Sequence, residues 1–216
     1  GGVICFSGAF HGRTMGAQMM TGNESEKGWI GHQDPNIFHL PFPYPWEKGV
    51  DYPKEFFKTS MSQLLEKEDL NPEKDLCGIM LETFQGWGAI FYPPEFVNEV
   101  ELFARECKAL LAFDEMQSGF GRTGTLFGYM HYAIEPDLLC CGKGASSGLP
   151  LALVLGPSQI MDLPSIGSNT TVGAAKEATV SDTVFPPVGK PASSAKFKAF
   201  MSRKSSDLKN FKIPLL

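Results

Sequence analysis

The feature that most constrains the fold is an alternation of short apolar runs with helix-like patterns. Residues 77–81, 110–113 and 138–141 have the length and the continuous apolar character of strands that are buried on both faces. Between the first two runs, Pro93 and Pro94 precede apolar residues that recur with the spacing of one helix face. Strands that alternate with helices favour an α/β fold, with a mostly parallel sheet and helices on both faces.

Other segments extend this pattern. Residues 3–6 predict a first strand, and residues 151–155 predict a further one. An amphipathic helix is expected from Pro53, because apolar residues follow it at helical spacing. These residues are Phe57, Met61, Leu64 and Leu65. Residues 7–51 are rich in Gly, Pro, His and aromatics without sustained periodicity, which predicts long loops that serve a site or an interface.

Each of the three central apolar runs ends close to a residue that can take part in chemistry. Glu82 and Asp114 directly follow the first two runs, and Lys143 comes two residues after the third. Sites in parallel α/β sheets gather beyond the carboxyl ends of the strands. We therefore expect these three side chains to belong to one site. A structural ion pair between the lysine and a carboxylate is the alternative.

Composition bounds the class of protein and divides the chain. The net charge of −5 and the 43% hydrophobic content exclude a disordered, collagen-like or strongly nucleic-acid-binding protein. Residues 1–166 hold 11 Lys and Arg against 21 Asp and Glu, whereas residues 167–216 hold 8 against 3. This shift predicts an acidic folded part, residues 1–166, and a divergent basic tail, residues 167–216, with little stable structure.

The cysteines and the N-terminus indicate the compartment. The five cysteines are odd in number and lack CxxC spacing, which favours core thiols over a disulfide framework or a zinc site. No apolar stretch approaches the ~20 residues of a membrane helix, and no secretion-signal pattern opens the chain. We expect a cytoplasmic protein without a membrane partner or a metal. Because Gly1 and Gly2 directly precede an apolar run, we also expect further sequence upstream.

Four segments carry recognisable motifs. Residues 113–124 read Phe-Asp-Glu-Met-Gln-Ser-Gly-Phe-Gly-Arg-Thr-Gly, and residues 136–144 read Pro-Asp-Leu-Leu-Cys-Cys-Gly-Lys-Gly, followed by Gly-Leu-Pro at 148–150. With Ala-Phe-His-Gly-Arg-Thr-Met-Gly at 9–16 and Glu-Thr-Phe-Gln-Gly at 82–86, they resemble class III pyridoxal-phosphate aminotransferases, most closely the ω-amino-acid (4-aminobutyrate-type) members. The resemblance covers residue 1 to about residue 166. It implies an incomplete large domain of a fold-type I pyridoxal-phosphate transferase.

The resemblance implies pyridoxal 5'-phosphate as cofactor and gives the matched residues their roles. Lys143 would form the aldimine with the cofactor and then, as a free amine, shuttle a proton. Asp114 would pair with the pyridine nitrogen, so that the ring can accept electrons. Gln117 would donate to the phenolic oxygen, and Phe10 would stack on the ring. The alternatives are a loop-stabilising amide for Gln117 and an ordinary core residue for Phe10.

Three further residues are expected near the cofactor. Arg13 matches an arginine that meets the carboxylate of the amino donor, with a surface ion pair as the alternative. Glu82 matches a family carboxylate that lies close to the cofactor. The role of this carboxylate is less uniform among family members. His11 could line the same pocket, although a loop histidine satisfied by its own neighbours is the more expected case.

The sequence also departs from the family pattern. Trp87 stands where many relatives carry a glutamate that covers a second arginine, which favours a monocarboxylate acceptor such as pyruvate over 2-oxoglutarate. The phosphate-binding turn would lie before residue 1. The family's threonine followed by Gly-Asn-Pro is absent, and Thr170 and Thr171 are the candidate substitutes for that threonine. We expect no resemblance to the family beyond Gly173.

The function that the resemblance implies is transfer of an amino group from an ω-amino acid or amine to a 2-oxo acid, by a ping-pong mechanism. Family members build each site between two subunits, so the full-length enzyme is expected to be a homodimer. Two alternatives stay open. One is a catalytically silent fragment or non-enzymatic remnant, whose tail is divergent or frameshifted. The other is a decarboxylase or aminomutase of the same fold.

Overall fold

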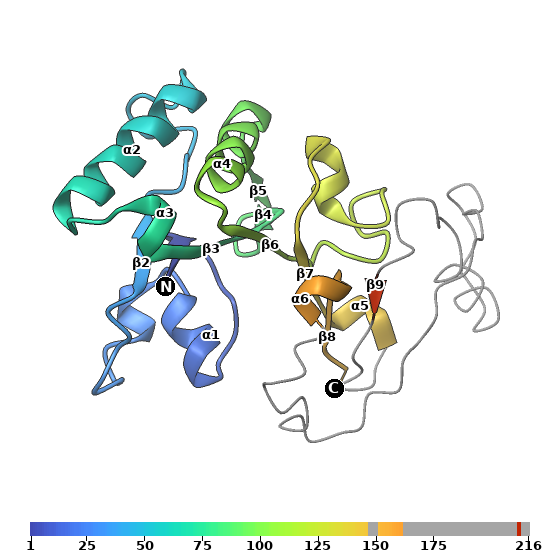
Figure 1. Cartoon of the computed structure of the whole chain (residues 1–216). Coiled ribbons are helices and arrows are strands. Elements are labelled where there is room, and N and C mark those ends of the chain that lie inside the picture. Colours follow the sequence, from blue (N-terminus) through green and yellow to red (C-terminus); the bar gives the residue numbers. More distant parts are fainter. Residues whose placement is uncertain (147–150, 162–210, 213–216) are drawn as a thin grey trace. The chain divides into compact units, whose positions relative to one another are not determined.

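A parallel sheet with helices on both faces forms the N-terminal part of the chain (Figure 1). The computed structural model describes residues 1–146, 151–161 and 211–212. The chain divides into two units, Gly1–Asp137 and Leu138–Leu216.

The strands of the first unit follow the expected parallel arrangement. They are β1 (Gly2–Phe6), β2 (Ile37–Leu40), β3 (Leu76–Glu82) and β6 (Leu110–Asp114). They lie in the order β2-β1-β3-β6, and each neighbouring pair is parallel. The register of β3 and β6 places Glu82 opposite Asp114 at the carboxyl ends of both strands. The predicted strands at 3–6, 77–81 and 110–113 are confirmed.

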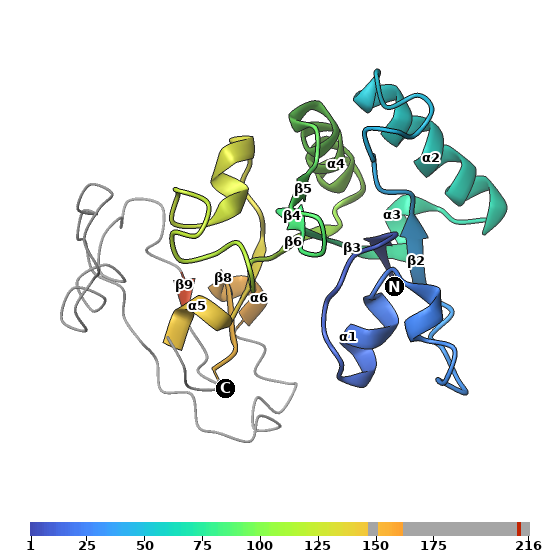
Figure 2. The same ribbon diagram turned by 180° about the vertical axis from the view of Figure 1, so that it is seen from behind.

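Helices cover both faces of this sheet. They are α1 (Met15–Met20), η1 (Glu24–Glu26), α2 (Pro53–Lys67), α3 (Pro72–Asp75), α4 (Pro94–Cys107) and η2 (Gly128–Tyr132). The two opposite views show α2 and α4 on one side of the strands and α1 on the other (Figures 1 and 2). Within the described residues, no helix combines the length and the apolar character that a membrane crossing needs.

The ends of α2 and α4 follow from their sequences. Pro53 and Pro94 occupy the start of each helix, where a missing N–H and a fixed φ are favourable. Lys108 ends α4 with a left-handed φ of 60°, and the chain then turns directly into β6. The helices predicted from Pro53 and from Pro93–Pro94 are therefore confirmed.

Aromatic side chains fill the space between this helical layer and the sheet. Phe6 of β1 packs edge-on against Tyr92 and Phe96, with ring centroids 5.4 and 5.7 Å apart. Phe57 of α2 meets Phe96 of α4 at 5.4 Å. Edge-to-face pairs of this kind each contribute about 0.5–1.5 kcal/mol beyond the area they bury. Phe96 therefore joins both helices to the centre of the sheet.

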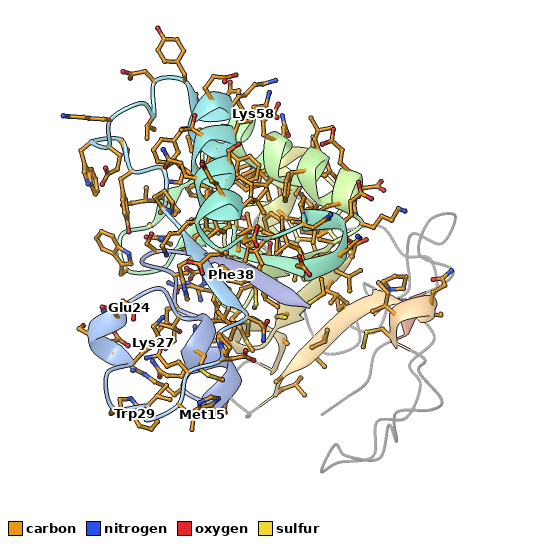
Figure 3. All side chains as sticks on the ribbon, turned by 60° about the vertical axis from the view of Figure 1, so that its left-hand side comes forward. Met15, Glu24, Lys27, Trp29, Phe38 and Lys58 are labelled. Carbon is orange, nitrogen blue, oxygen red and sulfur yellow. The ribbon has the colours of Figure 1, made fainter. Side chains whose placement is uncertain are left out.

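The lobe formed by α1 and η1 contains a buried lysine. The Lys27 side chain is almost completely buried, and its Nζ lies 2.7 Å from Oε1 of Glu24. Figure 3 shows both residues in this lobe, with Met15 and Trp29 at its outer edge. The indole N–H of Trp29 donates to the carbonyl of Glu26 at 3.0 Å. A buried ammonium needs a nearby counter-charge, and Glu24 supplies it.

The second unit carries antiparallel strands. These are β7 (Leu138–Cys141), β8 (Leu153–Pro157) and β9 (Phe211–Lys212), paired in that order. Two short helices, α5 (Lys143–Ser146) and α6 (Ser158–Met161), follow β7 and β8. The apolar runs at 138–141 and 151–155 thus contain strands, but the second is antiparallel to the first and begins at Leu153.

The sequence-based prediction was wrong at three places. Residues 7–51 were expected to be loops, yet they contain α1 and the sheet strand β2. The hairpin of β4 (Phe84–Gln85) and β5 (Ile90–Phe91) was not anticipated. Cys77 is exposed rather than a core thiol, whereas Cys5 and Cys107 are buried as expected. Most of the predicted tail, 167–216, lies outside the described residues, and the division at residue 166 stays a prediction.

Candidate active site

Two buried carboxyl groups lie side by side where β3 and β6 end. Glu82 and Asp114 are paired in register, and both side chains are almost completely buried. The preceding strand residues are apolar and include buried core residues in both strands, so the first polar residue of each strand falls at the carboxyl end of the sheet. The sequence therefore correctly predicted that these two residues share a location.

His11 reaches this pair from the loop after β1. Its Nδ1 lies 2.9 Å from Oδ2 of Asp114, and its side chain is fully buried. The Nε2 of the same ring has no hydrogen-bond partner within the described part of the chain. The expectation that loop neighbours satisfy this side chain was wrong, because its partner is distant in sequence. The contact forms because β3 pairs with both β1 and β6 and so brings the loop after β1 to the end of β6. A local sequence pattern does not predict such a long-range contact.

Backbone groups complete the surroundings of the two carboxyls. The N–H of Met116 donates to Oδ1 of Asp114 at 3.0 Å. The N–H of Phe10 donates to Oε2 of Glu82 at 3.3 Å. Burial and the neighbouring Asp114 raise the pKa of Glu82 to about 7, although His11 and nearby backbone N–H groups act in the opposite direction. Glu82 thus readily gains or loses a proton near neutral pH.

Phe10 and Arg13 form the exposed side of the cluster. The ring of Phe10 is 43% exposed, so it is not the ordinary core residue of the alternative interpretation. The Cζ of Arg13 lies over this ring, 5.2 Å from its centroid. Arg13 also pairs with Oε2 of Glu26 at 2.7 Å, and its side chain is 64% exposed. The structure therefore contains the surface ion pair of the alternative interpretation.

The turn after β6 is held by a carboxylate that the sequence did not single out. Glu115 is buried and accepts four hydrogen bonds, each 2.7 or 2.8 Å long. The donors are the hydroxyls of Thr83 and Ser118 and the backbone N–H groups of Gly128 and Tyr129. Four donors satisfy both carboxylate oxygens, so Glu115 fixes the turn on which Asp114 and Gln117 lie.

Gln117 is exposed on this turn. Its amide lies so close to Gly86 that a Cβ at Gly86 would overlap Oε1 of Gln117. The glycine therefore allows the turn after β6 to approach the segment that follows Glu82. The cofactor-binding role of Gln117 is not tested by this contact and stays a prediction.

A second hydrogen-bonded group lies beside the carboxyl cluster and was also missed. The buried amide of Gln85 accepts from Tyr44 Oη at 2.7 Å and from Trp87 Nε1 at 2.8 Å. Its Nε2 donates to the carbonyl of Ser7 at 2.6 Å. Gly8, with a φ of +75°, makes the turn that brings this loop close to Tyr44. These contacts fix the orientation of Trp87, whose indole is largely exposed.

Lys143 belongs to the second unit. It follows β7 by two residues and begins α5, and its side chain is exposed. Across the described residues, no group of three or more His, Cys, Asp or Glu side chains has a geometry that could hold a metal ion.

Solved structures define the class of fold. An (S)-enantioselective ω-transaminase from Thermomicrobium roseum is 28% identical, with a TM-score of 0.68 over 80% of this chain and 39% of that chain. An amine transaminase from an uncultivated Pseudomonas species, solved in a pyridoxal-phosphate-bound form, is 26% identical, with a TM-score of 0.66 over 74% of this chain and 37% of that one. The fold is that of the transaminases, as expected for a fold-type I domain.

The family model for class-III aminotransferases matches residues 1–185, and the chain belongs to that family. The match continues past Gly173, where the resemblance was expected to end. Acetylornithine aminotransferase of Bacillus subtilis is 34% identical over 170 residues, which cover 78% of this chain and 39% of that protein. Alanine/serine racemase of Pyrococcus horikoshii is 32% identical over 193 residues, covering 82% and 41%. The chain thus spans about two-fifths of the length of these relatives.

Proposed function

We propose that this protein takes part in pyridoxal-phosphate-dependent transamination, moving an amino group from an ω-amino acid or amine to a 2-oxo acid. The observation that carries the proposal is the buried Asp114, held by His11 Nδ1 at 2.9 Å, beside the exposed ring of Phe10. Membership of the class-III aminotransferase family supports the same activity.

The residues of the cluster fit the cofactor. Asp114 accepts one hydrogen bond on each oxygen, so lone pairs remain for a pyridinium N–H. Phe10, which is 43% exposed, offers a flat apolar ring on which the cofactor ring would stack. Gln117 would donate to the phenolic oxygen, and Lys143 would hold the aldehyde carbon. When bound, pyridoxal phosphate supplies an electron sink for the substrate carbon that loses its proton.

His11 and Met116 orient the carboxylate that faces the pyridine nitrogen. Both donate to Asp114, one to each carboxylate oxygen, and so hold the group in one orientation. An ionised Asp114 holds a proton on the ring nitrogen through a charge-assisted bond. Replacing Asp114 by Asn removes this charge, so we expect cofactor affinity to fall by at least about tenfold, since one such bond is worth roughly 1.5–3 kcal/mol.

Lys143 and Arg13 would act on the substrate. Lys143, whose side chain is exposed, would supply the amine that moves a proton at the substrate carbon. Arg13 would bind the donor carboxylate through its planar guanidinium, and the ion pair with Glu26 would then have to open. Arg13 is 64% exposed, but the Oε2 of Glu26 is buried without a hydrogen-bond partner among the described residues, so opening that pair has a cost that substrate binding must offset.

Trp87 bears on the choice of amino acceptor. Its indole N–H is bound to Gln85, and an indole cannot neutralise an arginine as a glutamate can. We infer a monocarboxylate acceptor such as pyruvate in preference to 2-oxoglutarate. Trp87→Glu is expected to lower the ratio of kcat/KM for pyruvate to that for 2-oxoglutarate, measured in the complete reading frame that encodes this chain. An unchanged ratio would contradict this inference.

Racemisation is a second candidate, because a racemase is among the relatives at 32% identity. The two reactions differ in their need for an acceptor. A transaminase converts a donor continuously only when a 2-oxo acid is supplied, whereas a racemase inverts alanine without one. Chiral analysis of alanine incubated with enzyme and cofactor, with and without pyruvate, separates them. Inversion without pyruvate would contradict transamination as the main activity, and no conversion of any donor would favour a catalytically silent protein.

A further inference from the structure

The carboxyl cluster brings two buried acidic groups together with a single histidine. Glu82 and Asp114 end neighbouring strands in register, both buried, and the imidazole of His11 contacts Asp114. Among the described residues, no lysine or arginine lies within ion-pairing distance of either carboxyl. The other titratable groups that face Glu82 are the phenols of Tyr44 and Tyr92, which add no positive charge.

The two carboxyls are not equivalent. Asp114 receives hydrogen bonds of 2.9 Å from His11 and 3.0 Å from the Met116 N–H. Glu82 receives a longer bond of 3.3 Å from the Phe10 N–H, and burial raises its pKa to about 7. When the cluster must hold one proton to relieve its charge, Glu82 is the residue that holds it.

We propose that Glu82 is a proton-linked positioning residue, which loses its proton when a cation is bound by Asp114. The inference rests on the proposed function, in which that cation is the protonated pyridine of the cofactor. A positive charge next to Asp114 removes the repulsion between the two carboxyls. The O–H bond of Glu82 then breaks, its electron pair stays on the carboxylate, and the proton passes to water. Binding of the cofactor and ionisation of Glu82 thereby favour each other.

This linkage predicts the sign of a pH dependence. A group that loses its proton on binding makes binding tighter as pH rises through its titration range. From about pH 6 to about pH 8, the dissociation constant of pyridoxal phosphate should therefore fall more in the wild-type chain than in Glu82→Gln. Glutamine cannot ionise, so the ratio of the two dissociation constants should be near one at the lower pH and roughly tenfold at the higher.

Two variants control this comparison. Glu82→Asp keeps a titrating carboxyl and should retain the pH dependence of the wild type. Glu99→Gln alters another buried glutamate, which lies on α4 beside Lys54 and Lys58, and should leave the ratio unchanged. Dissociation constants are measured from the quenching of tryptophan fluorescence in the 216-residue chain, so the readout does not need turnover. A ratio that does not vary with pH would overturn the proposal.

A second measurement needs no cofactor. Asp114→Asn removes the same negative charge that the cofactor cation would neutralise, so the titration midpoint of Glu82 should fall in that variant. The midpoint is followed by carboxyl-carbon NMR in wild type and variant. An unchanged midpoint would overturn the role of Glu82. Absence of cofactor binding at every pH would instead contradict the proposed function, so the two failures are distinguishable.

Discussion

At the residue scale, His11 links the loop after β1 to the end of β6. Its fully buried ring makes one hydrogen bond, to Asp114. The sequence could predict that Asp114 ends a strand, because the apolar run before it is clear. It could not predict the His11 contact, since the two residues meet only through the pairing of β1, β3 and β6.

This contact gives the first prediction. His11→Ala removes a hydrogen bond to a charged group, worth roughly 1.5–3 kcal/mol, and leaves Asp114 with the Met116 N–H alone. We expect the dissociation constant of pyridoxal phosphate to rise by about tenfold or more. The matched control is His32→Ala, at an exposed loop position. Equal affinities of the His11 and His32 variants would show that His11 does not position Asp114.

Glu82 gives a prediction for stability. Its folded-state pKa is about 7, above the ordinary value of 4.5, so the folded chain binds more protons than the unfolded chain between these values. Stability from Glu82 is therefore fully present below about pH 4.5 and is lost as pH rises through about 7. Near pH 8, Glu82→Gln should be more stable than wild type by roughly 3 kcal/mol in urea unfolding, and near pH 4.5 the two should agree.

The control for this measurement is Glu99→Gln, which removes a carboxylate paired with Lys54 and Lys58 at 3.4 and 3.5 Å. The stability of Glu99→Gln relative to the wild type should not increase as pH rises. A Glu82→Gln variant that is equally stable relative to wild type at both pH values would mean that Glu82 is ionised throughout.

At the scale of elements, the sequence predicted those whose pattern is strong and local. β3, β6, α2 and α4 each have a continuous apolar run or a clear helical stripe. β2 was missed because its four residues include His39 and lie in a segment rich in Gly and Pro, and its pairing with β1 supplies what the local pattern lacks. The hairpin β4–β5 was missed because each of its strands has only two residues, which is too short to show a strand pattern.

The helical layer gives the next prediction. Phe96 of α4 is 1% exposed and meets Phe6, Phe57 and Tyr92. Phe96→Ala is expected to lower the free energy of unfolding by about 3–5 kcal/mol, because it leaves a cavity between helix and sheet. Leu102→Ala, on the same helix with its side chain 53% exposed, should change it by less than about 1 kcal/mol. Similar losses for both variants would contradict the packing of α4 on the sheet.

At the scale of the whole molecule, the chain combines a well-defined parallel unit with a second unit that carries Lys143. The family match over residues 1–185 shows that both belong to a class-III aminotransferase sequence. The cluster around Asp114 lies within the first unit, and Lys143, the residue proposed to hold the aldehyde carbon, lies within the second. In the proposed function, Asp114 would pair with the pyridine nitrogen of the cofactor and Lys143 would hold its aldehyde carbon.

The most direct test of the proposed function is to identify the lysine to which pyridoxal phosphate becomes covalently attached. The 216-residue chain is incubated with the cofactor, reduced with borohydride and digested, and the peptides are analysed by mass spectrometry. We expect the reduced phosphopyridoxyl mass on the Lys143 peptide, its loss in Lys143→Ala, its weakening in Asp114→Asn and no change in the control Lys48→Ala. Labelling that is spread over other lysines, or that persists unchanged in Lys143→Ala, would contradict it.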